Sequence, residues 1–246
     1  MGDIDLGHLA VIAAGLTLAG IVKGATGLGY ASSALPFLVF AVGLRHAMAI
    51  VLLPAMATNI AVALFNGFLG ETWRTFSRMY FAMLPGILLG IWLLLASEPR
   101  HAVLVLGVTI VAYSLFALTR PHLSLTAAAA RSMQAPVGFA NGVLTGLTGS
   151  QVMPLVPYVM ALDMDPARSV QAINLGVLLS SAALAAALVA SGAVGQDLLL
   201  ASAAAVAPAV AGVEIGRRLR GLIPAEHFRV IVLLVLLASG IGMLAR

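Results

Sequence analysis

Long apolar runs separated by short breaks dominate the chain. They cover residues 47–65, 79–97, 101–119, 169–190, 198–213 and 228–245. Each run comes close to the roughly 20 residues with which a helix spans the hydrocarbon core of a bilayer. The runs are rich in Leu, Ala and Val, and they lack the strict alternation of a transmembrane β-barrel. The pattern therefore predicts an all-α polytopic membrane protein with no separate soluble domain.

The composition agrees with this interpretation. Hydrophobic residues make up 61% of the chain, charged residues only 9%, and the mean hydropathy is +1.08, whereas soluble domains carry about 25% charged residues. The pI of about 10.1 does not predict nucleic-acid binding, because the arginines are scattered over membrane loops and form no continuous basic face. The amino-terminal "MGDIDLGHLAVIAAG" lacks the basic region of a signal peptide, so we expect it to be the first membrane segment.

The chain repeats itself with an offset near 120 residues. Residues 23–67 can be aligned with residues 141–192, with small gaps. In this alignment Thr26-Gly27-Leu28 meets Thr145-Gly146-Leu147, and Lys23 meets Asn141. Such internal similarity indicates that two copies of one structural unit make up the protein.

The second part of each copy repeats as well, since residues 84–118 resemble residues 207–244. We therefore predict two membrane repeats, residues 1–122 and residues 123–246, with about five helical segments each. Glycines break the first two segments of each repeat, and the second segment is short. Whether these two segments span the membrane fully or are re-entrant stays open.

The arginines predict the orientation of the chain. If every segment crosses, eight arginines share one side and three share the other side with the amino terminus, so the first group is expected in the cytoplasm and both termini outside. With an odd number of segments per repeat, the second repeat has the opposite orientation in the membrane to the first. Such inverted repeats occur in many secondary transporters. The eight are Arg74, Arg78, Arg120, Arg131, Arg168, Arg217, Arg218 and Arg220; the three are Arg45, Arg100 and Arg246.

Glycine-rich breaks occur at matching places in both repeats, in "KGATGLGY" (23–30) and "NGVLTGLTGSQ" (141–151). A helix break at membrane depth is tolerated only where protein or a water-filled cavity satisfies the freed backbone groups. Matched breaks favour a binding site at the midplane, where the N-termini of half-helices face an anion. For any single glycine, close packing between membrane helices is an alternative explanation.

The only lysine of the chain, Lys23, lies at the first break. Its long side chain could reach the membrane surface from the end of a full-length helix. Alternatively, its ammonium group adds a full positive charge to a midplane anion site. The sequence leaves both interpretations open.

Polar residues inside the apolar segments are further candidates for the transport pathway. Asn59, Gln171 and Asn174 cost the most to bury, and the latter two share one helix face because they are three residues apart. The complete set of predicted pathway residues is Lys23, Gly24, Thr26, Gly27, Gly29, Ser32, Ser33, Asn59, Asn141, Thr145, Gly146, Thr148, Ser150, Gln151, Gln171 and Asn174.

Three charged residues are weaker candidates for gating or proton coupling, namely Arg45, Arg168 and Glu214. The alternative for Glu214 is an ion pair with Arg217 or Arg218 one turn on. The alternative for Arg168 is local pairing with the acidic turn that precedes it. No metal site is predicted, because the histidines all lie at segment ends without a ligand spacing.

Several motifs together resemble a known family. The stretch "KGATGLGYASSALPF", the short turn "GLRHA", the segment with Asn59, the motif "PGILLG" and a second copy in the same order are similar to the TauE/SafE family of sulfite and organosulfonate exporters. The resemblance implies a secondary carrier in the inner or plasma membrane. Its substrate would be sulfite, sulfoacetate or another small sulfur-containing or carboxylate anion, moved outward.

Two other functional classes are alternatives to a carrier. An anion channel could use the same broken helices to line a pore. An intramembrane enzyme is disfavoured, because the chain has no cysteine, no GxSxG motif and no histidine inside a segment. No cofactor and no nucleic acid are expected, the bilayer and a small anion are the expected partners, and a homo-oligomer and coupling to protons or another ion stay open.

Overall fold

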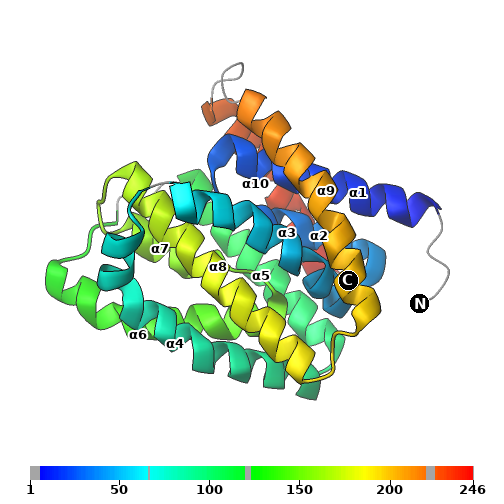
Figure 1. Cartoon of the computed structure of the whole chain (residues 1–246), viewed down its shortest axis with the longest axis horizontal. Helices are drawn as coiled ribbons and strands as arrows, with labels where there is room; N and C mark the ends of the chain where they lie inside the picture. The colour runs from blue at the N-terminus through cyan, green and yellow to red at the C-terminus, as the bar shows by residue number, and fades with distance from the viewer. Residues whose placement is uncertain (1–5, 66, 120–122, 220–224, 246) are drawn as a thin grey trace.

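The computed structural model describes residues 6–65, 67–119, 123–219 and 225–245, which form ten α-helices and no strand (Figure 1). The helices are α1 (Leu6–Thr26), α2 (Tyr30–Val42), α3 (Leu44–Phe65), α4 (Leu69–Ala96), α5 (Pro99–Thr119), α6 (Ala127–Thr148), α7 (Leu155–Met160), α8 (Pro166–Ala190), α9 (Gln196–Leu219) and α10 (Ala225–Leu244).

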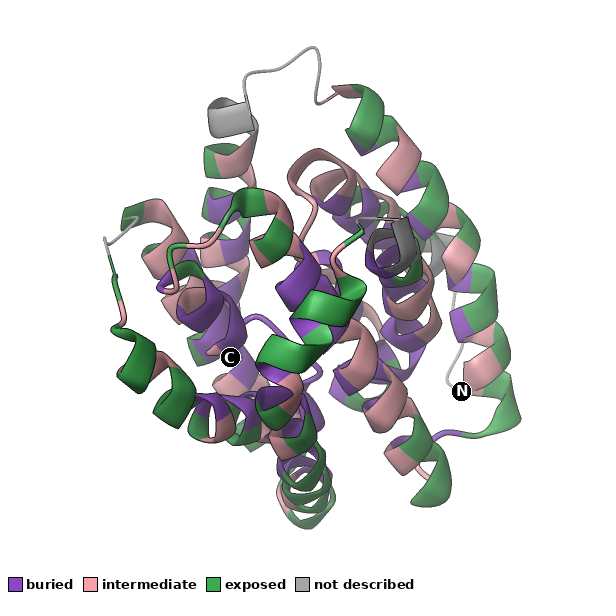
Figure 2. Ribbon diagram, turned by 60° about the vertical axis from the view of Figure 1, so that its left-hand side comes forward, coloured by how far each residue is buried: buried purple, intermediate pink, exposed green. Residues whose placement is uncertain are grey.

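Four of the described helices, α4, α5, α8 and α9, are long and apolar enough to cross a membrane, and α1, α2, α3 and α10 contain shorter apolar stretches. Large apolar side chains such as Leu88, Trp92 and Leu200 are 62 to 69% exposed. Figure 2 shows that buried residues gather where the helices face one another and exposed residues lie on the outside. This distribution suits a surface in lipid, so the prediction of an all-α polytopic membrane protein is confirmed.

The second segment of each predicted repeat is short, as expected from the sequence. Helix α2 has 13 residues and α7 has only six. The preceding helices, α1 and α6, end in the same way, at a glycine with a positive φ: 83° at Gly27 and 76° at Gly149. The amide of Gly27 donates to the carbonyl of Lys23 (2.7 Å), and that of Gly149 to the carbonyl of Thr145 (2.8 Å). Glycine adopts this left-handed conformation without a steric penalty, which explains why both helices stop there.

The threonines before these glycines, Thr26 and Thr148, form the same pair of hydrogen bonds. The hydroxyl of Thr26 donates to the carbonyl four residues back and accepts from the amide two residues on, and that of Thr148 does the same. The two breaks therefore match at an offset of 122 residues. The sequence alignment that pairs Thr26 with Thr145 is wrong by one helical turn. The segment "TGLTGS" carries two Thr-Gly pairs three residues apart, and the alignment chose the first.

Glycines also let two pairs of helices approach closely. Helix α1 packs along α9, and α4 packs along α6. A Cβ atom at Gly24 would overlap the carbonyl oxygen of Val213, and one at Gly146 would overlap that of Ile87. Small residues commonly allow such contacts between membrane helices. Packing therefore explains Gly24 and Gly146, whereas Gly27 is explained by the helix end.

The two helix pairs correspond to each other: α1 matches α6 at the offset of the breaks, and Gly86 of α4 matches Gly212 of α9 at an offset of 126 residues (212 − 86). Gly20 and Gly24 of α1 lie against α9 as Gly142 and Gly146 of α6 lie against α4. In each pair the residue numbers of both helices rise together along the contact, so the partners run parallel. Each contact joins a helix of one predicted repeat to a helix of the other. The division into residues 1–122 and 123–246 itself stays a prediction.

The helix contacts predict a contrast between two glycine-to-alanine variants. Gly146→Ala should lower stability by about 1 to 3 kcal/mol, because a methyl group forced between packed backbones strains them. Gly70→Ala should keep or raise stability, because no atom lies within 4 Å of the added Cβ atom and alanine favours helix. Thermal unfolding of the two variants in detergent measures the difference. Equal melting temperatures would contradict the close contact of α4 with α6.

Candidate functional site

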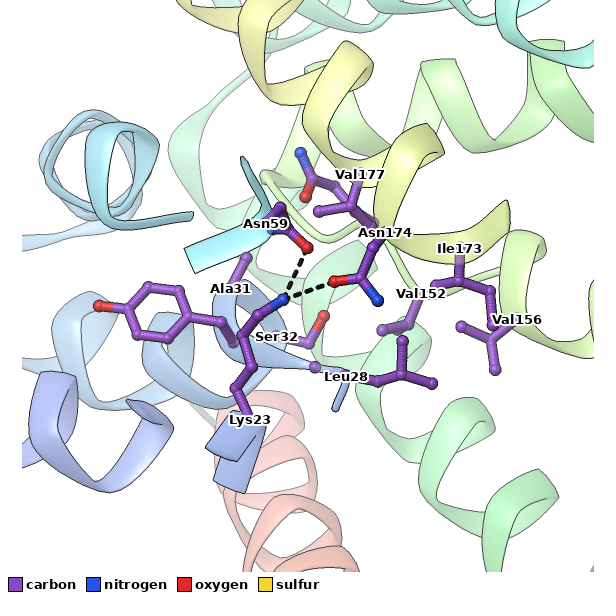
Figure 3. A pocket seen from close by; sticks show the side chains of 13 residues that line it. Lys23, Leu28, Ala31, Ser32, Asn59, Val152, Val156, Ile173, Asn174 and Val177 are labelled. Carbon is purple, nitrogen blue, oxygen red and sulfur yellow. Dashed lines mark hydrogen bonds between the residues drawn. The ribbon is translucent and has the colours of Figure 1, made fainter. Parts of the chain in front are cut away.

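The side chain of Lys23 lies inside the protein. Only 4% of the residue is exposed. Its Nζ atom donates to Asn59 Oδ1 at 2.6 Å and to Asn174 Oδ1 at 2.8 Å (Figure 3). Three helices, α1, α3 and α8, thus meet at one amino group. This position differs from that of a lysine that reaches toward the membrane surface.

Both asparagines are held with their oxygen atoms toward the lysine. The Nδ2 atom of Asn59 donates to the carbonyl of Ala55 at 2.6 Å. The Nδ2 atom of Asn174 donates to the carbonyl of Val170 at 2.8 Å and to that of Gly27 at 3.2 Å. Because the amide nitrogens are occupied by carbonyls, the amide oxygens are the atoms left for the ammonium group. The bond to Gly27 also attaches the first helix break to α8.

The partners of Lys23 carry no negative charge. Among the described residues, no carboxylate forms an ion pair with it; the ion pairs that do occur join exposed or half-exposed side chains near helix ends. A buried charge without a counterion is costly, in water-soluble proteins and in membranes alike. An ammonium group also has three N–H donors, of which the asparagines accept two. For the ammonium form of Lys23, the site thus lacks one acceptor and one negative charge.

A small cavity adjoins the lysine (Figure 3). It has room for water-sized spheres of about 20 Å³, which is enough for about one water molecule. Apolar side chains from α7 and α8 and from the two breaks form most of its wall. The lining residues are Lys23, Leu28, Gly29, Tyr30, Ala31, Ser32, Asn59, Gln151, Val152, Val156, Ile173, Asn174 and Val177.

A much larger cavity of about 560 Å³ lies beside the small one, between α1, α2, α5, α7 and α10. We call it the vestibule. Its wall is mainly apolar but includes the hydroxyl-bearing residues Thr26, Ser32 and Ser33. Leu28 and Val156 line both cavities, as do Gly29 and Ser32. These residues therefore form the boundary between the vestibule and Lys23. The other residues that line the vestibule are Val22, Tyr113, Phe116, Ala117, Leu123, Met160, Asp163, Arg229, Val232, Leu233 and Leu236.

Gln151 separates the small cavity from a third one of about 10 Å³. Its Nε2 atom donates to Ser181 Oγ at 2.9 Å. The two helix breaks meet close by, where Ser32 Oγ and Ser150 Oγ lie 3.3 Å apart. Gln151 and Ser32 thus lie at the junction of the predicted repeats.

The second break contains no counterpart of the lysine charge. At the offset of 122 residues, Lys23 corresponds to Thr145, and the earlier pairing with Asn141 is one turn off. The Thr145 hydroxyl donates to the carbonyl of Ser150 at 3.3 Å. With the oxygen and nitrogen of its side-chain amide exchanged, Asn141 donates to the backbone carbonyls of Gln151 and Met153, which lie in the link after α6. Both side chains hold the break in place.

The predicted pathway residues therefore fall into two groups. Half of them line the small cavity or the vestibule: Lys23, Thr26, Gly29, Ser32, Ser33, Asn59, Gln151 and Asn174. The others shape the breaks or the contacts between helices: Gly24, Gly27, Asn141, Thr145, Gly146, Thr148, Ser150 and Gln171. In the second group, Gln171 donates to the carbonyl of Ala63 at 2.9 Å and joins α8 to α3.

The three candidates for gating or coupling do not line any of the three cavities described above. Glu214 pairs with Arg217 at 2.8 Å and with Arg218 at 2.7 Å, so the prediction that it pairs one turn on is confirmed. Arg45 donates to the carbonyl of Leu94 at 3.2 Å. All of these groups lie near helix ends.

Arg168 pairs with a different partner from the one expected. It forms an ion pair with Glu71 at the start of α4, at 2.9 Å, and lies over the ring of Phe68. The acidic turn before it is used otherwise, since Asp165 caps α8 by accepting from the amide of Ala167 at 2.9 Å. The ion pair therefore joins α8 to α4.

Sequence reasoning missed the apolar boundary residues Leu28 and Val156, because apolar residues in a membrane protein give no signal of their own. It also missed Arg229, which lines the vestibule and donates to the carbonyl of Ala117 at 3.0 Å. A signal for Arg229 did exist, since it is a charged residue in the apolar run 228–245. Charges inside membrane segments usually mark functional positions.

Comparison with known proteins identifies the family. No curated protein and no solved structure matches the chain. The family described as Sulfite exporter TauE/SafE matches residues 11–243, which include Lys23, Asn59 and Asn174. The chain therefore belongs to the TauE/SafE sulfite exporter family.

Proposed function

We propose that the protein is a secondary carrier that exports a small anion through the plasma membrane by alternating access at the Lys23 cavity. Sulfite, organosulfonates and related sulfur-containing or carboxylate anions are the proposed substrates. Membership of a family of sulfite exporters supports anion transport and fits a protein that is not an enzyme. The observation that carries the choice of site is a buried lysine whose partners are two neutral amide oxygens.

The site suits an anion in charge and in hydrogen bonding. An anion beside Lys23 would supply the missing negative charge and accept the third N–H bond of the ammonium group. The hydroxyl-bearing Ser32 lines the same cavity. The two asparagines fix the position of Nζ before the anion arrives, so little ordering is left to the binding step.

The size of the cavity supports a carrier over a channel. Space for about one water molecule does not hold a sulfite or sulfonate ion, so the state described is closed around the lysine. In our proposal the substrate enters from the vestibule after Leu28 and Val156 move apart. The links at Gly27 and Gly149 are the proposed hinges, because both already depart from helical geometry.

The two predicted repeats indicate which helices would move together during alternating access. The matched contacts of α1 with α9 and of α4 with α6 support the proposal that the repeats are related by inversion. Each pair would then move as a rigid unit, because its backbones are in direct contact. Rocking of such units around a fixed site is the usual form of alternating access in inverted-repeat carriers.

Removal of the lysine charge tests the site. Lys23→Met keeps the length of the side chain, and sulfite affinity should fall at least tenfold, equivalent to about 1.4 kcal/mol. Lys23→Arg should be intermediate, because the guanidinium keeps the charge but differs in shape. Sulfite binding to the purified protein and efflux from proteoliposomes measure both variants.

A matched control removes a cation elsewhere. Arg217 is exposed at the end of α9, and Arg217→Met should leave sulfite affinity within about twofold of the parent, since exposed ion pairs contribute little. If Lys23→Met binds and exports sulfite like the parent, the anion site lies elsewhere.

Counterflow distinguishes a carrier from a channel. We expect saturable sulfite efflux from proteoliposomes, and external unlabelled sulfite should accelerate the exit of labelled sulfite. The physical reason is that the loaded site must reorient in each cycle. High flux that rises linearly with concentration and shows no counterflow would indicate a pore.

The orientation of the chain is also a proposal, with both termini outside. The chain has no native cysteine, so single cysteines can report it. Ser124→Cys lies in the exposed link between α5 and α6, and Gln196→Cys lies at the exposed start of α9. An impermeant maleimide added to intact cells should label position 196 and spare position 124. The opposite result would reverse the predicted topology.

A further inference from the structure

We infer that the exported anion crosses together with one proton, and that Lys23 Nζ carries this proton. The inference rests on the proposed function, because it concerns the same site. The coupling ion in this proposal is a proton, because the hydrogen-bond acceptors around Nζ match the donors of a neutral amine.

The empty site matches a neutral amine. A neutral lysine amine has two N–H donors and one lone pair, whereas the ammonium form has three donors. Asn59 and Asn174 provide two acceptor oxygens, at 2.6 and 2.8 Å. Their amide nitrogens are occupied by carbonyls, so neither side chain can turn without losing those bonds. Without an anion, two donors meet two acceptors and no charge is buried.

The loaded site matches the ammonium form. A bound anion offers the third acceptor and the countercharge, which the described residues around Lys23 do not supply. Protonation of the amine therefore favours anion binding, and anion binding favours protonation to the same extent. A carboxylate beside the lysine would remove this coupling, because the amine would then stay protonated in the empty site.

The transport cycle balances in charge and in protons. The amine takes up one proton from water that enters with the anion, and the ammonium and the anion reorient as a pair. On the other side the anion leaves and the ammonium returns its proton to water. The amine then returns neutral. Each cycle thus moves one anion and one proton, and a monovalent anion crosses without net charge.

The other titratable and charged groups on the elements around Lys23 do not share its position. Tyr30 is the only one that lines the same cavity among the described residues. Arg229 of α10 and Asp163 line the vestibule instead. On α9, which packs against α1, Glu214 pairs with Arg217 and Arg218 near the exposed end, and Asp197 lies in the first turn. The charged or titratable groups of α3 and α8 lie in the first turn of each helix: Arg45, His46 and Arg168.

Sulfite affinity as a function of pH tests the inference. The purified full chain is titrated with sulfite at about pH 8.5 and at about pH 9.5, where sulfite itself is already the dianion. If the empty site is neutral and one proton binds with each anion, the affinity of the parent should fall about tenfold over this pH unit. Lys23→Arg should show no such fall, because a guanidinium keeps its proton at both pH values.

Tyr30→Phe separates the lysine from the nearby phenol. This variant should keep the tenfold dependence on pH, whatever its absolute affinity. Equal sulfite affinity of the parent at the two pH values overturns the inference, as does a fall that persists in Lys23→Arg or disappears in Tyr30→Phe. In each of these cases sulfite still binds, so the proposed function stands. No sulfite binding by the parent at either pH overturns the proposed function and the inference with it.

Discussion

The contact of Lys23 with two asparagine oxygens is the constraint on which the site depends. An amino group buried here must have its N–H donors satisfied, and α3 and α8 bring acceptor oxygens to Nζ at 2.6 and 2.8 Å. The asparagines in turn depend on their own helices, since their amide nitrogens donate to carbonyls one turn back. The bond from Asn174 to the carbonyl of Gly27 extends this network to the first break. One buried lysine side chain therefore connects three helices.

The frame around this contact depends on glycine used in two ways. In the helix pairs, glycine removes side-chain bulk so that parallel backbones can touch. At Gly27 and Gly149, glycine instead supplies a left-handed conformation that ends a helix inside the protein. The first use makes rigid units, and the second makes the links between them. A carrier needs both, because rigid units can reorient around a site only if the links between them bend.

The sequence was sufficient for the fold class and for most of the polar residues that line the small cavity, because apolar runs and buried polar residues are local signals. It could not separate the two uses of glycine, which depend on what lies across the contact. The register of the repeat was misjudged by one turn, because "TGLTGS" offers two equivalent Thr-Gly pairs. The burial of Lys23 could not be predicted either. Its partners lie 36 and 151 residues away in the chain, and no local pattern reports such a meeting.

The difference between the two breaks explains why the charge occurs only once. Thr145 occupies the place of Lys23 in the second break, and its hydroxyl bonds the local backbone instead of facing the cavity next to Lys23. A second lysine there would bring two like charges to the junction where Ser32 meets Ser150, and like charges in a low-dielectric interior repel strongly. One cation also suffices for one small anion. In a pair of breaks with matching backbone geometry, the asymmetry of the side chains is therefore the reason why we propose an anion site beside the first break, with the second break as a neutral support.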